Sequence, residues 1–301
     1  MIFTVVIPSY NREKVVVRAI NSVLNQTFQD FEIIVVDDGS KDNTEATIKG
    51  VNDSRVMYIR QENAGACVAR NTGIQNARGK YVSFLDSDDV WFPLMLEKQL
   101  EQYKSDENVG CVYSRLQIVD GKGDIHSFKE MNVYGDCYAD VLRQGYMAPT
   151  SVLSAKRECF DIVGLFDVSF PASQDDDMCF KLAKHYKVGL IPEVMASMNV
   201  EQINRISNNP KRVADGWWML WNKYEEDVST LCGEKVIRHH YLDCLGRYAA
   251  IKEAGMYNLA YSKFVKYGGK LSLAQKVKYK LIGNGIYSYL QKFAIYIIRC
   301  Y

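Results

Sequence analysis

Apolar, strand-like runs alternate with amphipathic helical patterns along the first 120 residues, and this alternation limits the chain to few folds. Strands are predicted at residues 2–7, 31–36, 56–60, 81–86 and 109–118, and helices near 13–25, 43–50, 66–77 and 94–104. Strands that alternate with helices of this length require right-handed βαβ crossovers. The sequence therefore predicts an α/β fold with a mostly parallel central sheet.

The rest of the chain is less regular at first and then helical. From Lys211 onward we find only helical periodicity. We therefore predict one α/β domain over residues 1–210 and a helical C-terminal region over residues 211–301. Between the two patterns we expect short strands near 149–154 and 188–191 and a helix at 174–186.

Composition points to a globular protein of a reducing compartment. The 301 residues are 48% hydrophobic, which is enough for a full core. The eight cysteines have irregular spacings that suggest neither a disulfide framework nor a zinc site. The N-terminus lacks a signal-peptide pattern, and no apolar run approaches the roughly 18 residues of a membrane span. We expect a cytoplasmic protein.

The C-terminal tail is basic and amphipathic. The net charge is only +1, yet eight basic residues and no acid follow Glu253. Drawn as a helix, residues 286–301 separate a polar, basic arc from an apolar one. Two interpretations stay open: peripheral contact with an anionic membrane, or packing against the α/β domain or a partner subunit in a homo-oligomer. No nucleic-acid recognition motif is present.

Clusters of aspartate follow two of the predicted strands. Asp37-Asp38 closes one apolar run, and Asp86-Ser87-Asp88-Asp89 closes another. Ligands of open α/β sheets bind at the carboxyl ends of the strands, and carboxylates gathered there can hold a divalent cation. If the strand continues to residue 88, Asp86 and Asp88 share one face, because side chains alternate along a strand. We predict a Mg²⁺ or Mn²⁺ site at this pair.

The turn after the first strand argues against a dinucleotide enzyme. Residues Pro8 to Arg12 contain no glycine, so a pyrophosphate cannot approach this backbone as it does in a Rossmann fold. Tyr10 instead offers a flat face on which a base could stack. Asp38 could accept a hydrogen bond from the N3 proton of uracil or thymine.

A third acidic group opens the predicted helix at residue 174. Asp175, Asp176 and Asp177 follow one another, and acids in a first turn complement the helix dipole. Three in succession exceed what capping uses. One of them could be a general base that points back toward the sheet.

The order and spacing of five segments resemble the family 2 glycosyltransferases, the inverting enzymes of the GT-A fold. The resemblance covers the first 180 residues and not the last 90. The segments are Val6-Ile7-Pro8-Ser9-Tyr10-Asn11, Val36-Asp37-Asp38-Gly39-Ser40, Asn63-Ala64-Gly65 with Ala69-Arg70-Asn71, Leu85-Asp86-Ser87-Asp88-Asp89, and Gln174-Asp175.

The resemblance implies roles for individual residues. Pro8, Tyr10 and Asp38 would line the nucleobase pocket. Asp86 would lie by the ribose and the metal, Asp88 would bind the cation that bridges the diphosphate, and Asp175 would be the acceptor-activating base. Many members have a histidine where this chain has residues 200–207, so Arg205 would do its electrostatic work. Other motif residues expected in the donor site are Asn11, Gly65, Arg70 and Ser87.

The resemblance thus implies a metal-dependent glycosyltransferase of the hexosyltransferase type, with residues 1–210 as its catalytic domain. It would move a sugar with inversion from a nucleotide diphosphate donor, a UDP-sugar, to a hydroxyl of a glycan or lipid-linked glycan. Two alternatives remain: a nucleotidyltransferase that makes sugar nucleotides, and a non-catalytic sugar-nucleotide-binding protein. The nucleotidyltransferase would be expected to carry a glycine-rich signature after the first strand, which residues 8–12 lack.

Overall fold

The computed structural model describes residues 1–120, 125–127, 132–199, 208–276 and 279. The chain forms two compact units. The first comprises Met1–Ser169 and Gln174–Ile203, and the second comprises Phe170–Ser173 and Asn204–Tyr301. A functional division at residue 210 stays a prediction.

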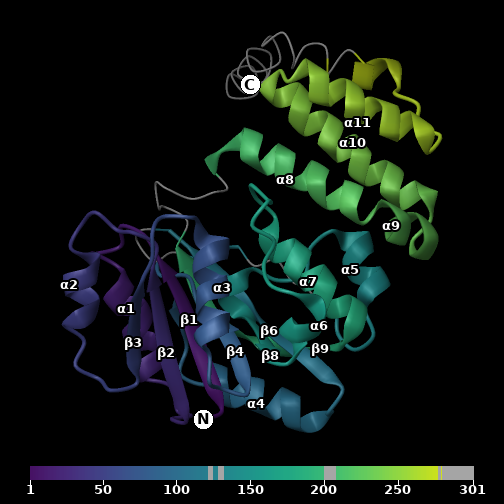
Figure 1. Cartoon of the computed structure of the whole chain (residues 1–301). Helices are drawn as coiled ribbons and strands as arrows, with labels where there is room; N and C mark the ends of the chain where they lie inside the picture. The colour runs from purple at the N-terminus through teal and green to yellow at the C-terminus, as the bar shows by residue number, and fades with distance from the viewer. Residues whose placement is uncertain (121–124, 128–131, 200–207, 277–278, 280–301) are drawn as a thin grey trace, which may run out of the picture. The chain divides into compact units, whose positions relative to one another are not determined.

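Nine strands in the described part of the first unit form a single sheet, in the order β3-β2-β1-β4-β8-β6-β9-β5, with β7 paired to β6 (Figure 1). Strands β1 to β4 are mutually parallel where they pair, which confirms the predicted fold class. The strands are β1 (Phe3–Ser9), β2 (Phe31–Asp37), β3 (Val56–Arg60), β4 (Tyr81–Phe84), β5 (Val90–Trp91), β6 (Val109–Val119), β7 (Ile125–Ser127), β8 (Leu153–Lys156) and β9 (Lys187–Asn199).

Helices connect and cover these strands. Strands β1 and β2 are buried along their whole length, which explains why their sequences are continuous apolar runs. Helix α3 packs directly on β1, where a Cβ at Gly73 would come within 2.2 Å of the Val6 side chain. The helices of this unit are α1 (Val16–Leu24), α2 (Thr44–Lys49), α3 (Ala66–Asn76), α4 (Met95–Ser105), α5 (Tyr138–Gln144), α6 (Cys159–Val163) and α7 (Gln174–His185), with a 3₁₀ turn η1 (Thr150–Val152).

The strand order places a ligand crevice at the end of β1. This strand lies between β2 on one side and β4 on the other, so the chain winds in opposite directions from it. Such a switch point leaves a crevice at the carboxyl ends of the strands. The loops that follow Ser9, Asp37 and Phe84 therefore meet at one edge of the sheet.

The structure differs from the sequence prediction in the bounds and the pairing of several strands. Strand β4 ends at Phe84, two residues earlier than expected. Strand β9 runs over 13 residues, whereas the sequence predicted a strand only at 188–191. Pro192 and the polar residues of β9 interrupt the apolar pattern that would identify a longer strand. The pairing of β9 with β6 is also irregular. The strand predicted near 149–154 is β8, which begins only at Leu153 and pairs antiparallel with both β4 and β6 in the mostly parallel sheet.

The second unit is helical in its described residues. Its helices are α8 (Pro210–Lys223), α9 (Glu225–Leu231), α10 (Glu234–Ile251) and α11 (Ala254–Lys266). The Asn209 side chain caps α8, because it accepts the backbone N–H groups of Lys211 and Arg212, each at 3.1 Å. Within the described part of the chain, no helix is long and apolar enough to cross a membrane.

One carboxylate holds three of these helices together. Glu225 accepts hydrogen bonds from Lys263, from Lys266 at 2.6 Å, from the Tyr267 hydroxyl at 2.6 Å and from the Tyr241 hydroxyl at 2.9 Å. Burial alone would raise the pKa of Glu225, but these donors outweigh it and lower the pKa to about 2. The cluster thus joins α9 to α10 and α11 as a structural element.

Candidate active site

The first wall of the crevice is the loop after β1. Pro8 is buried in β1 and lies beyond Val6, the last residue of β1 that pairs with β4. Its missing N–H therefore costs no hydrogen bond between β1 and β4. Tyr10 is exposed, with 39% of its surface open to solvent. Asn11 has a φ of 53°, a left-handed conformation that asparagine adopts more readily than most residues.

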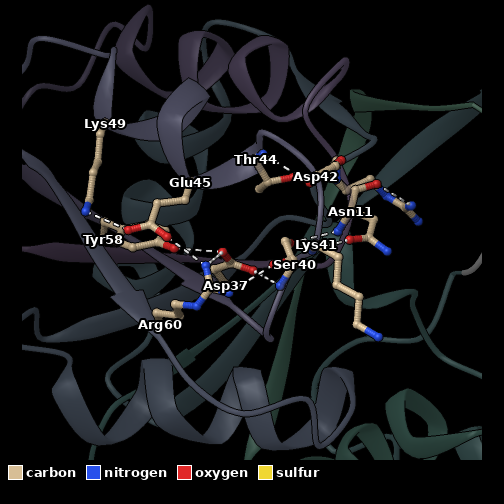
Figure 2. Close-up of polar contacts among 11 residues, drawn as sticks. Asn11, Asp37, Ser40, Lys41, Asp42, Thr44, Glu45, Lys49, Tyr58 and Arg60 are labelled. Atoms are coloured by element: carbon tan, nitrogen blue, oxygen red, sulfur yellow. Dashed lines mark hydrogen bonds and ion pairs between the residues drawn. The ribbon is translucent and has the colours of Figure 1, made fainter.

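Asn11 joins this loop to the loop after β2. Its backbone N–H donates to the Ser40 hydroxyl at 2.8 Å, and its side-chain oxygen accepts the N–H of Lys41 at 2.8 Å (Figure 2). The two predicted walls of the nucleobase pocket are therefore fixed to each other by backbone-directed bonds. In this structure Asn11 joins the two loops, and its contact with a ligand stays a prediction.

Asp37, the first acid after β2, is structural. It is fully buried; one carboxylate oxygen accepts the N–H of Ser40 at 2.8 Å, and the other accepts the Tyr58 hydroxyl at 2.7 Å. Arg60 lies 3.7 Å from the same carboxylate (Figure 2). Burial and the bond to Asp37 raise the pKa of Tyr58, so this hydroxyl remains a donor.

Asp38, the second acid, organises the loop before α3. Its Oδ1 accepts the Gln61 side chain at 2.8 Å and the Ala64 N–H at 2.9 Å, and its Oδ2 accepts the N–H of Gly65 at 2.8 Å. A carboxylate has about four lone-pair positions, so roughly one remains on Oδ2 for a ligand. Gly65 has a φ of 96°, which favours glycine at this helix start.

The buried guanidinium of Arg70 forms an ion pair with the partly exposed Asp86. The guanidinium of Arg70 donates to Asp86 Oδ1 at 2.6 Å, and the Arg70 side chain is only 6% exposed. Its Nε and Nη1 have no hydrogen-bond partner in the described structure, while Phe166 lies under the guanidinium with its ring centroid 5.6 Å away. The Asp86 side chain is 36% exposed and so remains open to a ligand.

The acidic residues after β4 lie in a turn, not in a strand. The N–H of Asp89 donates to the carbonyl oxygen of Asp86 at 3.0 Å, which closes the turn. The prediction that strand alternation puts Asp86 and Asp88 on one face is therefore wrong, because β4 ends before either of them. Ser87 is buried within this turn, and Asp88 is 9% exposed.

Two arginines that the motif analysis missed hold Asp88. Arg12 Nη2 lies 3.8 Å from the Asp88 carboxylate, and Arg18 Nη2 donates to the Asp88 carbonyl oxygen at 2.9 Å. Arg12 was visible in the sequence as the end of the glycine-free turn. Its approach to a residue 76 positions away depends on the strand order and could not be predicted locally.

The three acids at the start of helix α7 differ in their exposure to solvent. Asp176 and Asp177 are buried, and Asp177 pairs with Lys181 at 3.1 Å. Asp175 alone among the three is partly exposed. Gln174, which precedes it, is buried. Asp175 is therefore the one acid of these three that is partly open to solvent.

Burial raises the pKa of Asp175, and the charge of Arg70 opposes this shift without cancelling it. The negative charge of Asp86 adds to the rise. The carboxylates of Asp175 and Asp86 thus both interact electrostatically with the guanidinium of Arg70. A carboxylate with a raised pKa is a stronger base than an ordinary one, which suits a general base.

Asp86 and Asp88 are the candidate ligands for a cation that would bind together with a phosphate ligand. Among the described residues, no group of three or more His, Cys, Asp or Glu side chains is placed to hold a metal ion. Mg²⁺ in enzyme sites commonly takes one or two carboxylates and completes its shell with substrate phosphates and water. Asp86 and Asp88 supply that number. Arg205 lies outside the described residues.

Comparison with known proteins identifies the family. The model described as "Glycosyl transferase family 2" matches residues 4–157. An uncharacterized glycosyltransferase, RP339 of Rickettsia prowazekii, is 31% identical over 223 residues, which are 71% of this chain and 70% of that protein. The chain belongs to the family 2 glycosyltransferases, which confirms the resemblance and the assignment to this class of enzyme. It spans about a third of the length of three longer Rickettsia relatives.

A named relative and two solved structures add detail. The E. coli protein "UDP-Glc:alpha-D-GlcNAc-diphosphoundecaprenol beta-1,3-glucosyltransferase WfgD" is 36% identical over 126 residues, 42% of this chain and 49% of its own. S. aureus TarS 1–349 in complex with UDP-GlcNAc shares the fold, with a TM-score of 0.67, 17% identity and coverage of 97% and 92%. The mannosyltransferase PcManGT from Pyrobaculum calidifontis, in complex with GDP-Man and Mn²⁺, has a TM-score of 0.58, 17% identity and coverage of 97% and 86%.

We predict that Asp175→Asn raises the melting temperature at pH 7 while Asp177→Asn lowers it. The raised pKa means that ionised Asp175 destabilises the fold, and the neutral amide removes this cost. Asp177→Asn instead leaves the poorly exposed Lys181 without its charge partner and should cost roughly 3 kcal/mol. Thermal unfolding of the three proteins checks this.

The pH dependence provides the control. Below the ordinary aspartate pKa of about 3.9, Asp175 is protonated in both the folded and the unfolded state, so its stabilising replacement should lose its effect there. The gain should be complete only above the raised folded-state pKa. Equal destabilisation by both substitutions at pH 7 would contradict the assignment of Asp175 as the strained, functional acid.

Proposed function

We propose that the protein transfers a sugar from a UDP-sugar to a hydroxyl of a glycan or lipid-linked glycan, with inversion and with Mn²⁺ or Mg²⁺. One observation carries this proposal: a donor-side acid, Asp86, and a partly exposed acid of raised pKa, Asp175, interact with the same buried Arg70 at the switch point of the sheet. Inverting transfer needs a donor site and an acceptor base side by side.

The nucleobase binds between the loops after β1 and β2. The exposed ring of Tyr10 stacks on the base, Pro8 lies behind it, and the remaining lone pair of Asp38 accepts the N3 proton of uracil. The complex of TarS with UDP-GlcNAc and the UDP-Glc in the name of WfgD support a UDP donor. PcManGT was solved with GDP-Man, so the nucleotide titration compares GDP with UDP.

The diphosphate lies over the turn of residues 86–89. Asp86 and Asp88 would hold the cation, with Arg12 3.8 Å from the Asp88 carboxylate and Ser87 between the two acids in the chain. When bound, the cation neutralises charge on the departing diphosphate. The Mn²⁺ in the PcManGT complex supports this choice of metal. Arg205, which lies outside the described residues, is proposed to add positive charge that offsets the charge of the diphosphate.

Asp175 accepts the proton of the acceptor hydroxyl as that oxygen attacks the anomeric carbon. The bond to the diphosphate breaks on the opposite face, so the configuration inverts in a single displacement. Asp175 is suited to this step because it is accessible and basic, whereas Asp177 is engaged with Lys181. No covalent sugar–enzyme bond forms.

The acceptor is proposed to be a sugar on a lipid carrier at the cytoplasmic face of a membrane. The diphosphoundecaprenol acceptor in the name of WfgD and the basic residues after Glu253 support this proposal. The whole amphipathic segment 286–301, which would contact the membrane or a partner subunit, lies outside the described residues. Family membership favours neither a nucleotidyltransferase nor a non-catalytic binding protein.

We predict that Asp88→Asn abolishes the metal-dependent part of donor binding. Wild-type protein should bind UDP at least about tenfold more tightly with Mn²⁺ than without it, since a cation offsets repulsion between two carboxylates and a diphosphate. Calorimetric titration with UDP, GDP and dTDP measures this and also identifies the base. Asp140→Asn, a surface acid paired with Arg143, is the control and should bind as wild type does. Equal Mn²⁺-dependent affinity in Asp88→Asn and wild type would rule out the metal assignment.

A separate prediction concerns the tail. Each Lys or Arg near an anionic membrane contributes about 1 kcal/mol, and salt weakens the attraction. In liposome flotation the full-length protein should therefore bind anionic but not neutral vesicles and should dissociate at high salt. A chain that ends before Ile286 should bind less. The membrane interpretation fails if full-length protein stays in solution at low salt while the truncation turns an oligomer into monomers.

A further inference from the structure

A single buried serine holds both ends of the turn that carries Asp86 and Asp88. The hydroxyl oxygen of Ser151 accepts the backbone N–H of Asp86 at 3.1 Å, and the same hydroxyl donates to Asp89 Oδ2 at 2.5 Å. Ser151 is 2% exposed and Asp89 is 1% exposed. Because so little solvent reaches this pair, water cannot readily replace the hydroxyl in either bond.

The backbone of Ser151 extends the same attachment to β5. Its carbonyl oxygen accepts the indole N–H of Trp91 at 2.7 Å, and Trp91 is 2% exposed. Ser151 therefore contacts the first residue of the turn, the last residue of the turn and the strand that follows it. These bonds attach the turn that carries Asp86 and Asp88 to the rest of the sheet, since β4 has already ended at Phe84.

The chain just before Ser151 reaches the base-bearing helix. The thiol of Cys179 lies 3.5 Å from the carbonyl oxygen of Ala148, and Cys179 is one helical turn beyond Asp175 on the same face. Cys179 and Ala148 are both buried. Residues 148–151 thus contact the turn of the donor-side acids at one end and helix α7 at the other.

We propose that Ser151 is a positioning residue for glycosyl transfer. Its hydroxyl sets the orientation of Asp86 and Asp88 toward the donor diphosphate and its cation, while the segment 148–151 keeps that turn in register with Asp175. Ser151 itself touches no reacting atom. The inference rests on the proposed function, because it assigns a purpose to the geometry of the two acids. It explains why Asp89 is buried beneath the turn: its carboxylate is the acceptor that orients the serine hydroxyl.

The chain contains a matched control in Ser154. This serine is fully buried three residues further on, and its hydroxyl is bonded to the Tyr103 hydroxyl at 2.9 Å, in β8 rather than at the turn. Ser151→Ala and Ser154→Ala each remove one buried hydroxyl, so both should lower the melting temperature. Only Ser151→Ala should also change the binding of metal and nucleotide.

The experiment is a titration of the full chain with UDP at several Mn²⁺ concentrations. We expect Ser151→Ala to weaken Mn²⁺-dependent UDP binding about tenfold or more and to raise the Mn²⁺ concentration for half-maximal binding, since a buried bond to a charged group is lost. Ser154→Ala should bind as wild type does. Ser151→Thr, which keeps a hydroxyl, should recover part of the lost affinity.

The outcomes separate this inference from the donor assignment. Unchanged UDP affinity and Mn²⁺ dependence in Ser151→Ala would overturn the role of Ser151 while leaving the proposed function intact. The same would follow if Ser151→Thr were no better than Ser151→Ala, or if Ser154→Ala weakened binding equally. If the wild type bound none of UDP, GDP and dTDP with Mn²⁺, the proposed function would fail, and the inference would fail with it.

Discussion

The acidic edge of the sheet depends on the buried, positively charged guanidinium of Arg70. Carboxylates gathered at the ends of neighbouring strands repel one another, and burial adds to the cost of their charge. Arg70 offsets this by donating to Asp86 at 2.6 Å and by interacting electrostatically with Asp175. The buried guanidinium in turn needs the carboxylate of Asp86, because removing one side of such a pair typically costs several kcal/mol. Arg70 therefore makes the acidic site compatible with a stable fold.

The surrounding residues fix the guanidinium in place. Asn71, next in the chain, donates its side-chain amide to the Phe166 carbonyl oxygen at 2.9 Å and accepts the Phe166 N–H at 2.9 Å. This reciprocal pair holds the Phe166 ring under Arg70. Two adjacent residues of α3 thus position the charge and its apolar support. The site is preorganised before a substrate arrives, which is how enzymes limit the reorganisation cost of electrostatic catalysis.

Patterns within one element could be predicted from the sequence, and contacts between distant elements could not. The apolar runs of β1 and β2 and the acidic start of α7 gave the right element types because hydrophobic period and capping are local. The prediction that Asp86 and Asp88 share one face of a strand was wrong, because the chain forms a turn there, closed by a hydrogen bond from the Asp89 N–H to the Asp86 carbonyl oxygen. The N–H groups that donate to Asp38 have no local signature in the sequence, and neither does the hydrogen bond from the Asp86 N–H to Ser151, 65 residues away. Both follow from the strand order.

The central claim is that Asp175 acts on the acceptor while the neighbouring acids act on the donor. Its most direct test compares sugar transfer and UDP binding in Asp175→Asn, with Asp177→Asn beside it. The account predicts that Asp175→Asn loses transfer by a factor on the order of 10² to 10⁴ and still binds UDP with Mn²⁺ nearly as wild type does. Near-normal turnover in Asp175→Asn, with an inactive Asp177→Asn that remains folded, would contradict it and move the base by two residues.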